Sequence, residues 1–120
     1  MNSILIIDDD DQLRNSFKKL LSEEGYKVDG AASGEAGLNF VKKEVPDIVI
    51  LDMRLPGMNG LETFRAIRKI EPKLPVIIMT AFGTTETAIE ATKLGAFDYI
   101  LKPFDIPDML SLVKQAISAS

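Results

Sequence analysis

The sequence predicts an α/β fold built on one doubly wound, five-stranded parallel sheet, and two observations carry that prediction. Short apolar runs rich in β-branched residues alternate five times with segments whose apolar residues recur at helical spacing. Some of these runs, such as Ile48–Leu51, are apolar throughout, which is typical of strands that helices cover on both faces. A β-α order repeated five times therefore predicts a three-layer sandwich with right-handed crossovers.

The first part of the chain predicts two strand–helix units. Ser3–Ile7 is a short apolar strand, and the helix after it ends at Gly25, a typical residue just past a helix. The inward face of that helix carries four apolar residues at helical spacing, Leu13, Phe17, Leu20 and Leu21. Tyr26–Ala31 predicts a weaker strand, and Ser33 is a typical N-cap for the second helix.

The remainder of the chain predicts three more units. The strand Ile48–Leu51 leads into the loop Asp52–Gly60, which contains Pro and two Gly, and then into a helix at Leu61–Ile70. Three further elements are predicted, a strand at Val76–Met79, a helix capped by Thr84 or Thr85 that runs through Leu94 to Gly95, and a strand at Phe97–Leu101. Asp105 is the expected cap of a final helix.

Composition excludes several classes of function. The 120 residues predict a single domain spanning 1–120. The absence of Cys and His removes disulfides, thiolate metal sites and the commonest general base. A net charge of −4 argues against direct nucleic-acid binding. Apolar runs all fall short of a membrane span, and the first residues lack a signal-peptide pattern, so we expect a cytoplasmic protein.

Polar residues follow the predicted strands in a pattern that packing does not require. Asp8 and Asp9 follow the first strand, Asp52 the third, Thr80 the fourth, and Lys102 the fifth. In an open α/β sheet, ligands bind at the carboxyl ends of the strands, so these groups are expected to converge. Asp10 and Asp11, by contrast, are sufficiently explained as the cap and first turn of the first helix.

Three converging carboxylates predict a metal site. Two carboxylates ~5 Å apart at an effective dielectric constant of ~20 repel each other by roughly 3 kcal/mol, so the group needs a cation. Oxygen ligands without His or Cys favour Mg²⁺, with Mn²⁺ as the alternative. Such an ion neutralises charge on a transferred phosphoryl group, Thr80 and Lys102 can contact phosphate oxygens, and a carboxylate can accept a phosphoryl group covalently. Asp52, beside a Gly-bearing loop, is the best placed acceptor.

Four segments carry a resemblance to a known family: ILIIDDDDQLR, PDIVILDMRLPGMNGLE, PVIIMTAFG and GAFDYILKPFD. Over essentially its whole length the chain resembles receiver domains of bacterial two-component response regulators, the CheY-like superfamily. It looks most like the receivers of NtrC-type enhancer-binding transcription activators. The resemblance implies a strand order of 2-1-3-4-5, phosphorylation by a sensor histidine kinase, and an effector domain that this chain does not contain.

The resemblance also implies roles for individual residues. Asp52 would be the phosphoacceptor. Mg²⁺ would be bound directly by Asp9, through water by Asp8, and by the backbone carbonyl of Arg54. Thr80 and Tyr99 match the family's switch pair, and Lys102 matches its phosphate-binding lysine, with a cis peptide between Lys102 and Pro103.

Further expectations concern partners. The face formed by the fourth helix, the fifth strand and the fifth helix would switch on phosphorylation, then form a homodimer or bind an effector. Its expected contact residues are Ile89, Ala91 and Ala96. By analogy, Gln12, Arg14, Asn15 and the loop after Asp52 would contact the kinase.

Three other functions compete with this interpretation. An aspartate-nucleophile phosphatase of the haloacid dehalogenase type needs a second Asp two residues after the nucleophile, where this sequence has Arg54. A flavodoxin-like FMN carrier needs a phosphate loop rich in Ser, Thr and Gly after the first strand, where this chain has four Asp. A phosphate-independent pseudo-receiver that serves only for docking would have no need of the full Asp, Thr and Lys set.

Overall fold

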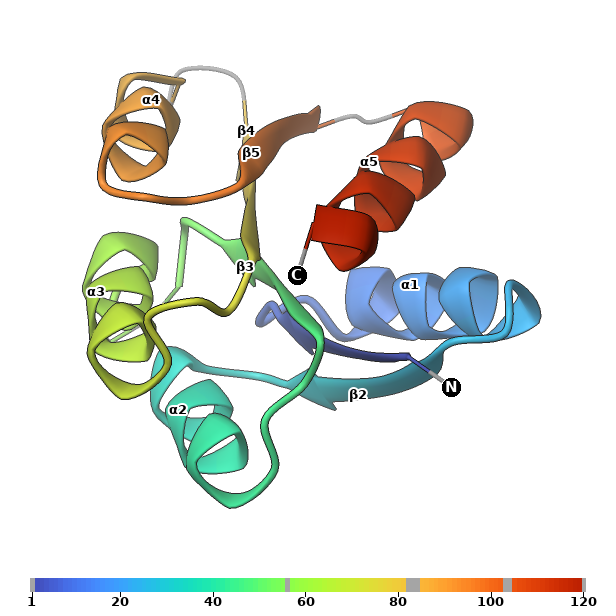
Figure 1. Cartoon of the computed structure of the whole chain (residues 1–120), viewed down its shortest axis with the longest axis horizontal. Helices are drawn as coiled ribbons and strands as arrows, with labels where there is room; N and C mark the ends of the chain where they lie inside the picture. Colours follow the sequence, from blue (N-terminus) through green and yellow to red (C-terminus); the bar gives the residue numbers. More distant parts are fainter. Residues whose placement is uncertain (1, 56, 82–84, 103–104, 120) are drawn as a thin grey trace.

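The computed structural model describes residues 2–55, 57–81, 85–102 and 105–119, and within these ranges it has five strands alternating with five helices (Figure 1). The strands are β1 (Ser3–Ile7), β2 (Lys27–Ala31), β3 (Ile48–Asp52), β4 (Val76–Ala81) and β5 (Asp98–Lys102). The helices are α1 (Asp11–Glu23), α2 (Gly34–Lys43), α3 (Gly60–Ile70), α4 (Thr85–Lys93) and α5 (Ile106–Ala119). No helix among the described residues is long and apolar enough to span a bilayer.

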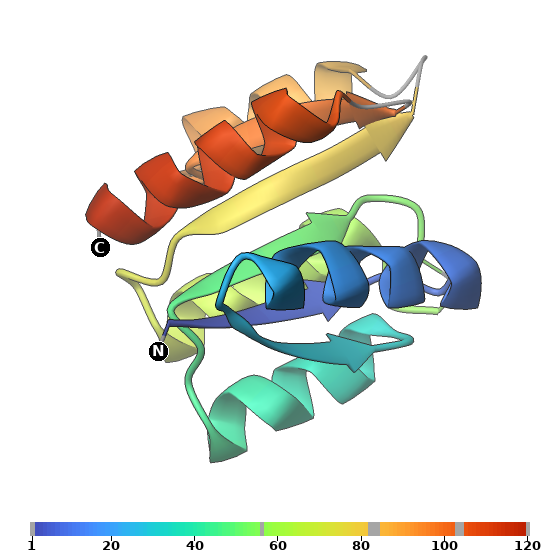
Figure 2. The same ribbon diagram turned by 90° about the vertical axis from the view of Figure 1, so that its right-hand side faces the viewer.

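The strands form one parallel sheet in the order β2-β1-β3-β4-β5, which confirms the predicted fold class and strand order. Helices α1 and α5 cover one face of the sheet, and α2, α3 and α4 cover the other (Figure 1). Because all five strands run the same way, their carboxyl ends meet at one edge (Figure 2).

Both faces of the sheet are buried, and the side chains of β1 show how. Leu5 and Ile7 point into the core beneath α2, α3 and α4, whereas Ile4 and Ile6 point into the core beneath α1 and α5. All four side chains are at most 1% exposed. Strands buried on both faces have no polar face to alternate with, which explains the unbroken apolar runs in the sequence.

Side-chain caps fix where the helices begin. The Asp10 carboxylate accepts a hydrogen bond from the Leu13 N–H (3.1 Å), and the Ser33 hydroxyl accepts one from the Ala36 N–H (3.1 Å). Helix α3 begins with a reciprocal capping box between Asn59 and Glu62. These contacts satisfy N–H groups that the first helical turn leaves unpaired. They confirm the predicted caps at Asp10 and Ser33, while Thr84 lies outside the described residues.

Three strands extend further than the apolar pattern indicated. Strand β3 ends at Asp52, β4 at Ala81 and β5 at Lys102. Strand pairing depends on the backbone, so polar residues continue it wherever a neighbouring strand is present. The pairing of Asp52 with Met79 shows this for β3 and β4. At their other ends, β2 and β5 each begin one residue later than predicted.

The expected contact residues on α4 and β5 need a correction. Ile89 is exposed, as a partner-binding residue should be, but Ala91 and Ala96 are 0% and 7% exposed and belong to the core under α4. Small side chains at these positions let α4 pack closely on the sheet. The prediction that Ala91 and Ala96 face a partner was therefore wrong.

A guanidinium joins the C-terminal ends of α3 and α4. Arg68 donates hydrogen bonds to the carbonyls of Glu71 (3.1 Å), Pro72 (3.2 Å) and Gly95 (3.3 Å). Its guanidinium carbon lies 5.1 Å from the centre of the Phe64 ring, and burial lowers the pKa of the Arg68 side chain. Arg68 thus fastens the turn that ends α4 to the end of α3.

Candidate phosphoacceptor and metal site

Three carboxylates meet at the carboxyl edge of the sheet. Asp8 follows β1, Asp52 ends the neighbouring strand β3, and one carboxylate oxygen from each of Asp8, Asp9 and Asp52 lies within 4.8 Å of the others. Asp8 and Asp52 are 0% and 4% exposed, whereas Asp9 is open to solvent. The structure therefore brings together the three residues that the sequence predicted as metal ligands.

Backbone hydrogen bonds orient the two buried carboxylates. Asp8 Oδ1 accepts from the Asp10 N–H (2.9 Å), and Asp52 Oδ1 accepts from the Arg54 N–H (3.0 Å). Each bond joins a carboxylate to the amide two residues later, so the chain turns around the side chain as it leaves its strand.

The donor set fits a hard divalent cation. All three side chains offer oxygen, two of them from buried positions, and their oxygens are close enough to share one ion. An exposed Asp9 leaves one side of the cluster accessible to water and to a phosphate-bearing partner. Mg²⁺ and Mn²⁺ prefer such oxygen ligands and keep several waters, so these residues could hold either ion.

The residues predicted to supply the hydroxyl and the ammonium group, Thr80 and Lys102, belong to the next two strands. Thr80 is fully buried on β4, one residue beyond Met79, the partner of Asp52. Lys102 is the last residue of β5 and pairs with Ala81. Both therefore belong to the same sheet edge as the carboxylates. Pro103 and the predicted cis peptide before it lie outside the described residues.

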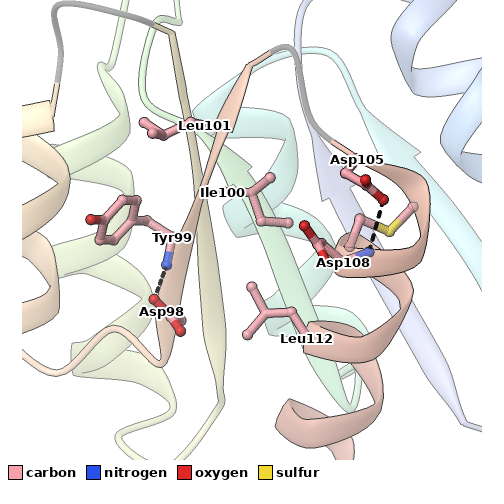
Figure 3. A pocket seen from close by; sticks show the side chains of 8 residues that line it. Asp98, Tyr99, Ile100, Leu101, Asp105, Asp108 and Leu112 are labelled. Atoms are coloured by element: carbon pink, nitrogen blue, oxygen red, sulfur yellow. Dashed lines mark hydrogen bonds between the residues drawn. The ribbon is translucent and has the colours of Figure 1, made fainter.

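Tyr99 lies on β5 opposite Ile78 and packs, half-buried, against the core under α4. Figure 3 shows that Tyr99 and Ile100 leave β5 on opposite sides, with Ile100 directed toward α5. A groove of about 500 Å³ lies between β5 and α5, and its lining combines apolar residues such as Ile100 and Met109 with Asp98, Asp105 and Asp108. The Tyr99 side chain therefore packs on the α4 side of β5, whereas the groove lies on the α5 side.

Sequence reasoning missed two features that order the site. Arg14, which was predicted to contact the kinase, donates a hydrogen bond from Nη1 to the Asp8 carbonyl (2.7 Å), and its side chain is 17% exposed. Gly60, the first residue of α3, donates its N–H to the Met53 carbonyl (3.3 Å) and so packs directly behind Asp52. The sequence predicted both the third strand and Gly60 at the loop end, but not that Gly60 packs against the end of that strand.

Comparisons with known proteins agree with this geometry. Residues 4–114 match the response regulator receiver domain family. The chain is 38% identical to regulatory protein AtoC of Escherichia coli (strain K12) over 98% of this chain, and 41% identical to sporulation initiation phosphotransferase F of Bacillus subtilis (strain 168) over 93% of this chain. It spans only 25% of AtoC but 90% of phosphotransferase F.

Solved structures give the same result. A response regulator receiver domain protein from Clostridium thermocellum matches with a TM-score of 0.94 at 37% identity, over 98% of this chain and 95% of that one. The receiver domain of NtrX from Brucella abortus matches with a TM-score of 0.93 at 33% identity, over 98% and 99% of the two chains. Phosphorylation and Mg²⁺ binding are typical of this family, whose role is regulatory. The chain belongs to the response regulator receiver domain family of two-component systems, with NtrC-type transcription regulators among its relatives.

Proposed function

We propose that this chain is a phosphorylation switch in which Asp52 accepts a phosphoryl group from a phosphohistidine of a sensor histidine kinase. The observation that supports it best is the convergence of Asp8, Asp9 and Asp52 within 4.8 Å, with buried Thr80 on the adjoining strand. In this proposal residues 1–120 act as a single receiver domain. Its output is control of transcription through an effector, by analogy with the regulators AtoC and NtrC.

The carboxylates and a carbonyl would hold the metal ion. Asp9 and Asp52 are proposed as direct ligands of Mg²⁺, Asp8 as a ligand mainly through water, and the Arg54 backbone carbonyl as a further oxygen ligand. The ion, when bound, neutralises negative charge on the phosphoryl group during transfer. The hydrogen bond from the Arg54 N–H to Oδ1 orients the Asp52 carboxylate at the end of β3.

The transfer exchanges one bond to phosphorus for another. The Asp52 carboxylate attacks phosphorus, an O–P bond forms, and the N–P bond of the phosphohistidine breaks. The departing imidazole nitrogen keeps the electron pair and takes up a proton, and Asp52 becomes an acyl phosphate. Lys102 is proposed to contact a phosphoryl oxygen as a point charge, which offsets the negative charge brought into the site.

Incubation with acetyl phosphate and Mg²⁺, followed by intact-mass measurement, tests the proposal. A receiver gains ~80 Da, the mass of one phosphoryl group, and loses it on standing. EDTA should prevent the gain, because the carboxylate cluster then lacks its counter-charge. A chain that takes up no phosphate under these conditions, yet is folded, would instead be a docking module, and the proposal would be wrong.

Asp9→Asn is expected to separate stability from function. Removal of one of three neighbouring negative charges should raise the free energy of unfolding without metal by about 1 kcal/mol, while phosphate uptake is lost. Urea unfolding in EDTA measures the first effect, and intact mass the second. Glu90→Gln, which neutralises an exposed carboxylate on α4, is the control and should change neither. An Asp9→Asn protein less stable than the parent in EDTA would contradict the repulsion argument.

The switch is proposed to run from Thr80 through Tyr99 to the α4–β5–α5 face. A phosphoryl group on Asp52 adds acceptor oxygens near the Thr80 hydroxyl, and movement of Thr80 would change the packing around Tyr99. The face carries exposed apolar side chains at Ile89, Leu94 and Leu101, and the groove of Figure 3 beside them. A homodimer or an effector is proposed to bind there once the domain is phosphorylated.

Thr80→Ala and Lys102→Ala are expected to take up phosphate yet switch poorly, because these residues contact the phosphoryl group without accepting it. Amide chemical shifts with and without beryllofluoride, a phosphoryl mimic, measure switching. In the parent protein the changes should extend from Asp52 to Tyr99 and α4, and in Thr80→Ala they should stop near Asp52. Parent changes confined to the Asp52 pocket would contradict the switch, while leaving phosphate uptake intact.

A further inference from the structure

We propose that Arg14 is a positioning residue for the metal-binding loop, and that Gly30 on β2 is a glycine because the Arg14 side chain passes over it. Together they would hold the Asp8–Asp9 turn in the geometry that binds Mg²⁺. The inference rests on the proposed function and adds to it a residue pair outside the cluster. It also gives β2, an edge strand with no side chain in the cluster, a part in forming the site.

The Asp8 residue is held at three points. Its N–H donates to the Ala31 carbonyl at the end of β2 (3.0 Å), its Oδ1 accepts from the Asp10 N–H (2.9 Å), and its carbonyl accepts from Arg14 Nη1 (2.7 Å). The first bond continues the strand pairing, and the second is local to the turn. The third comes from a side chain one helical turn into α1, so it fixes the direction in which the chain leaves Asp8.

The guanidinium is itself fixed. Arg14 Nη2 forms an ion pair with Asp11 on the first turn of α1, and the Arg14 side chain is 17% exposed while that of Asp11 is 79% exposed. Two nitrogens of one planar group thus bond to two acceptors, a fork that lysine cannot reproduce.

Gly30 leaves room for this arrangement. A Cβ at Gly30 would lie 2.8 Å from Arg14 Cδ and 3.0 Å from Arg14 Cγ, closer than non-bonded carbons approach. The backbone of Gly30 is not in the left-handed region, so alanine could adopt it without strain. The obstacle is therefore the stem of Arg14, whose two hydrogen bonds hold it against the strand.

The test measures Mg²⁺ affinity from the change in amide chemical shifts of the whole chain on titration with MgCl₂. Loss of a hydrogen bond that orients a metal-binding loop typically weakens binding by 10-fold or more, so Arg14→Ala should bind Mg²⁺ about 10-fold more weakly. Arg14→Lys, which keeps one donor and the charge, should fall between the parent and Arg14→Ala. Arg65→Met removes an exposed arginine on α3 and is the control, with unchanged affinity.

Gly30→Ala supplies the decisive comparison. In the parent it should also weaken Mg²⁺ binding about 10-fold, because the added methyl displaces Arg14. In the Arg14→Ala background it should have little further effect, since the atoms it would strike are gone. A merely structural defect would add in both backgrounds. In the parent, Mg²⁺ should also shift the Gly30 amide, and in Arg14→Ala this shift should be smaller at saturating Mg²⁺, whereas Ala31 should still respond through the hydrogen bond that its carbonyl accepts from the Asp8 N–H.

The outcomes distinguish the inference from the proposed function. If the parent binds Mg²⁺ and Arg14→Ala binds it equally well, the positioning role is wrong and the proposed function stands. If Gly30→Ala weakens binding equally with and without Arg14, the explanation of Gly30 is wrong. If the parent does not bind Mg²⁺ at millimolar concentrations, the proposed function fails and the positioning role fails with it.

Discussion

Asp52→Asn abolishes phosphate uptake: we expect no ~80 Da species after incubation with acetyl phosphate and Mg²⁺, where the parent shows one. An amide is a poor nucleophile at neutral pH, and the substitution also removes one of the three negative charges that the metal ion requires. The Arg54 N–H can still donate to the side-chain amide oxygen of the variant, so the fold is expected to survive.

Asp47→Asn is the matched control for this variant. Asp47 lies just before β3, at the opposite end of the strand that Asp52 terminates, and it too accepts a backbone N–H, that of Ser3 (2.6 Å). Asp47→Asn should be phosphorylated like the parent. Phosphorylation of the Asp52→Asn protein at the parental rate would overturn the acceptor assignment, and a second acceptor could then be located by peptide mass mapping.

Gly60→Ala should destabilise the protein by about 3 kcal/mol and impair phosphorylation at the same time. Helix propensity alone predicts the opposite, because alanine favours helices over glycine. However, the added Cβ would fall against Met53 Cα and lie 2.8 Å from the Asp52 carbonyl oxygen. Backbone atoms cannot rotate away as a side chain can, so α3 or the end of β3 must shift, and Asp52 shifts with it.

Gly25→Ala separates this steric effect from backbone strain. Gly25 has a φ of +93°, but nothing lies within 4 Å of an added Cβ, so the substitution should cost about 1 kcal/mol and leave phosphorylation unchanged. Urea unfolding gives both free energies of unfolding. Equal losses for the two variants would contradict the packing of Gly60 against β3.

The sequence predicts most of this fold because its strands are buried on both faces, which leaves unbroken apolar runs between helical patterns. The apolar pattern predicts strands that are too short, since Asp52 and Lys102 continue the strand pairing although their side chains are polar. It also fails to separate buried from exposed small residues on α4. Ala91 packs in the core, a position that depends on how closely α4 approaches the sheet.

Some residues of the candidate site could likewise be predicted from the sequence, and others could not. Asp8, Asp9, Asp52 and Thr80 could be predicted because one rule, the shared edge of parallel strands, brings together residues far apart in the chain. The contact between Arg14 and Gly30 could not, since it depends on the angle at which α1 crosses β2. A lone Arg in an acidic segment and a lone Gly in a weak strand have many ordinary explanations, and only the structure joins them.

Arg68 holds the C-terminal end of α4 in place, so we expect α4 to tilt about that end. One of the three hydrogen bonds of this arginine, from Arg68 Nη2 to the Gly95 carbonyl (3.3 Å), joins the turn after α4 to α3, while the first residue of α4, Thr85, follows four residues after the end of β4. Helix α4 has nine residues with a rise of 1.5 Å each, so it is about 13 Å long. A tilt of about 20° about its C-terminal end would move its N-terminal end by about 5 Å. A displacement of the N-terminal end decreases along the helix toward Gly95, so the exposed Ile89, near the middle of α4, would move about half as far.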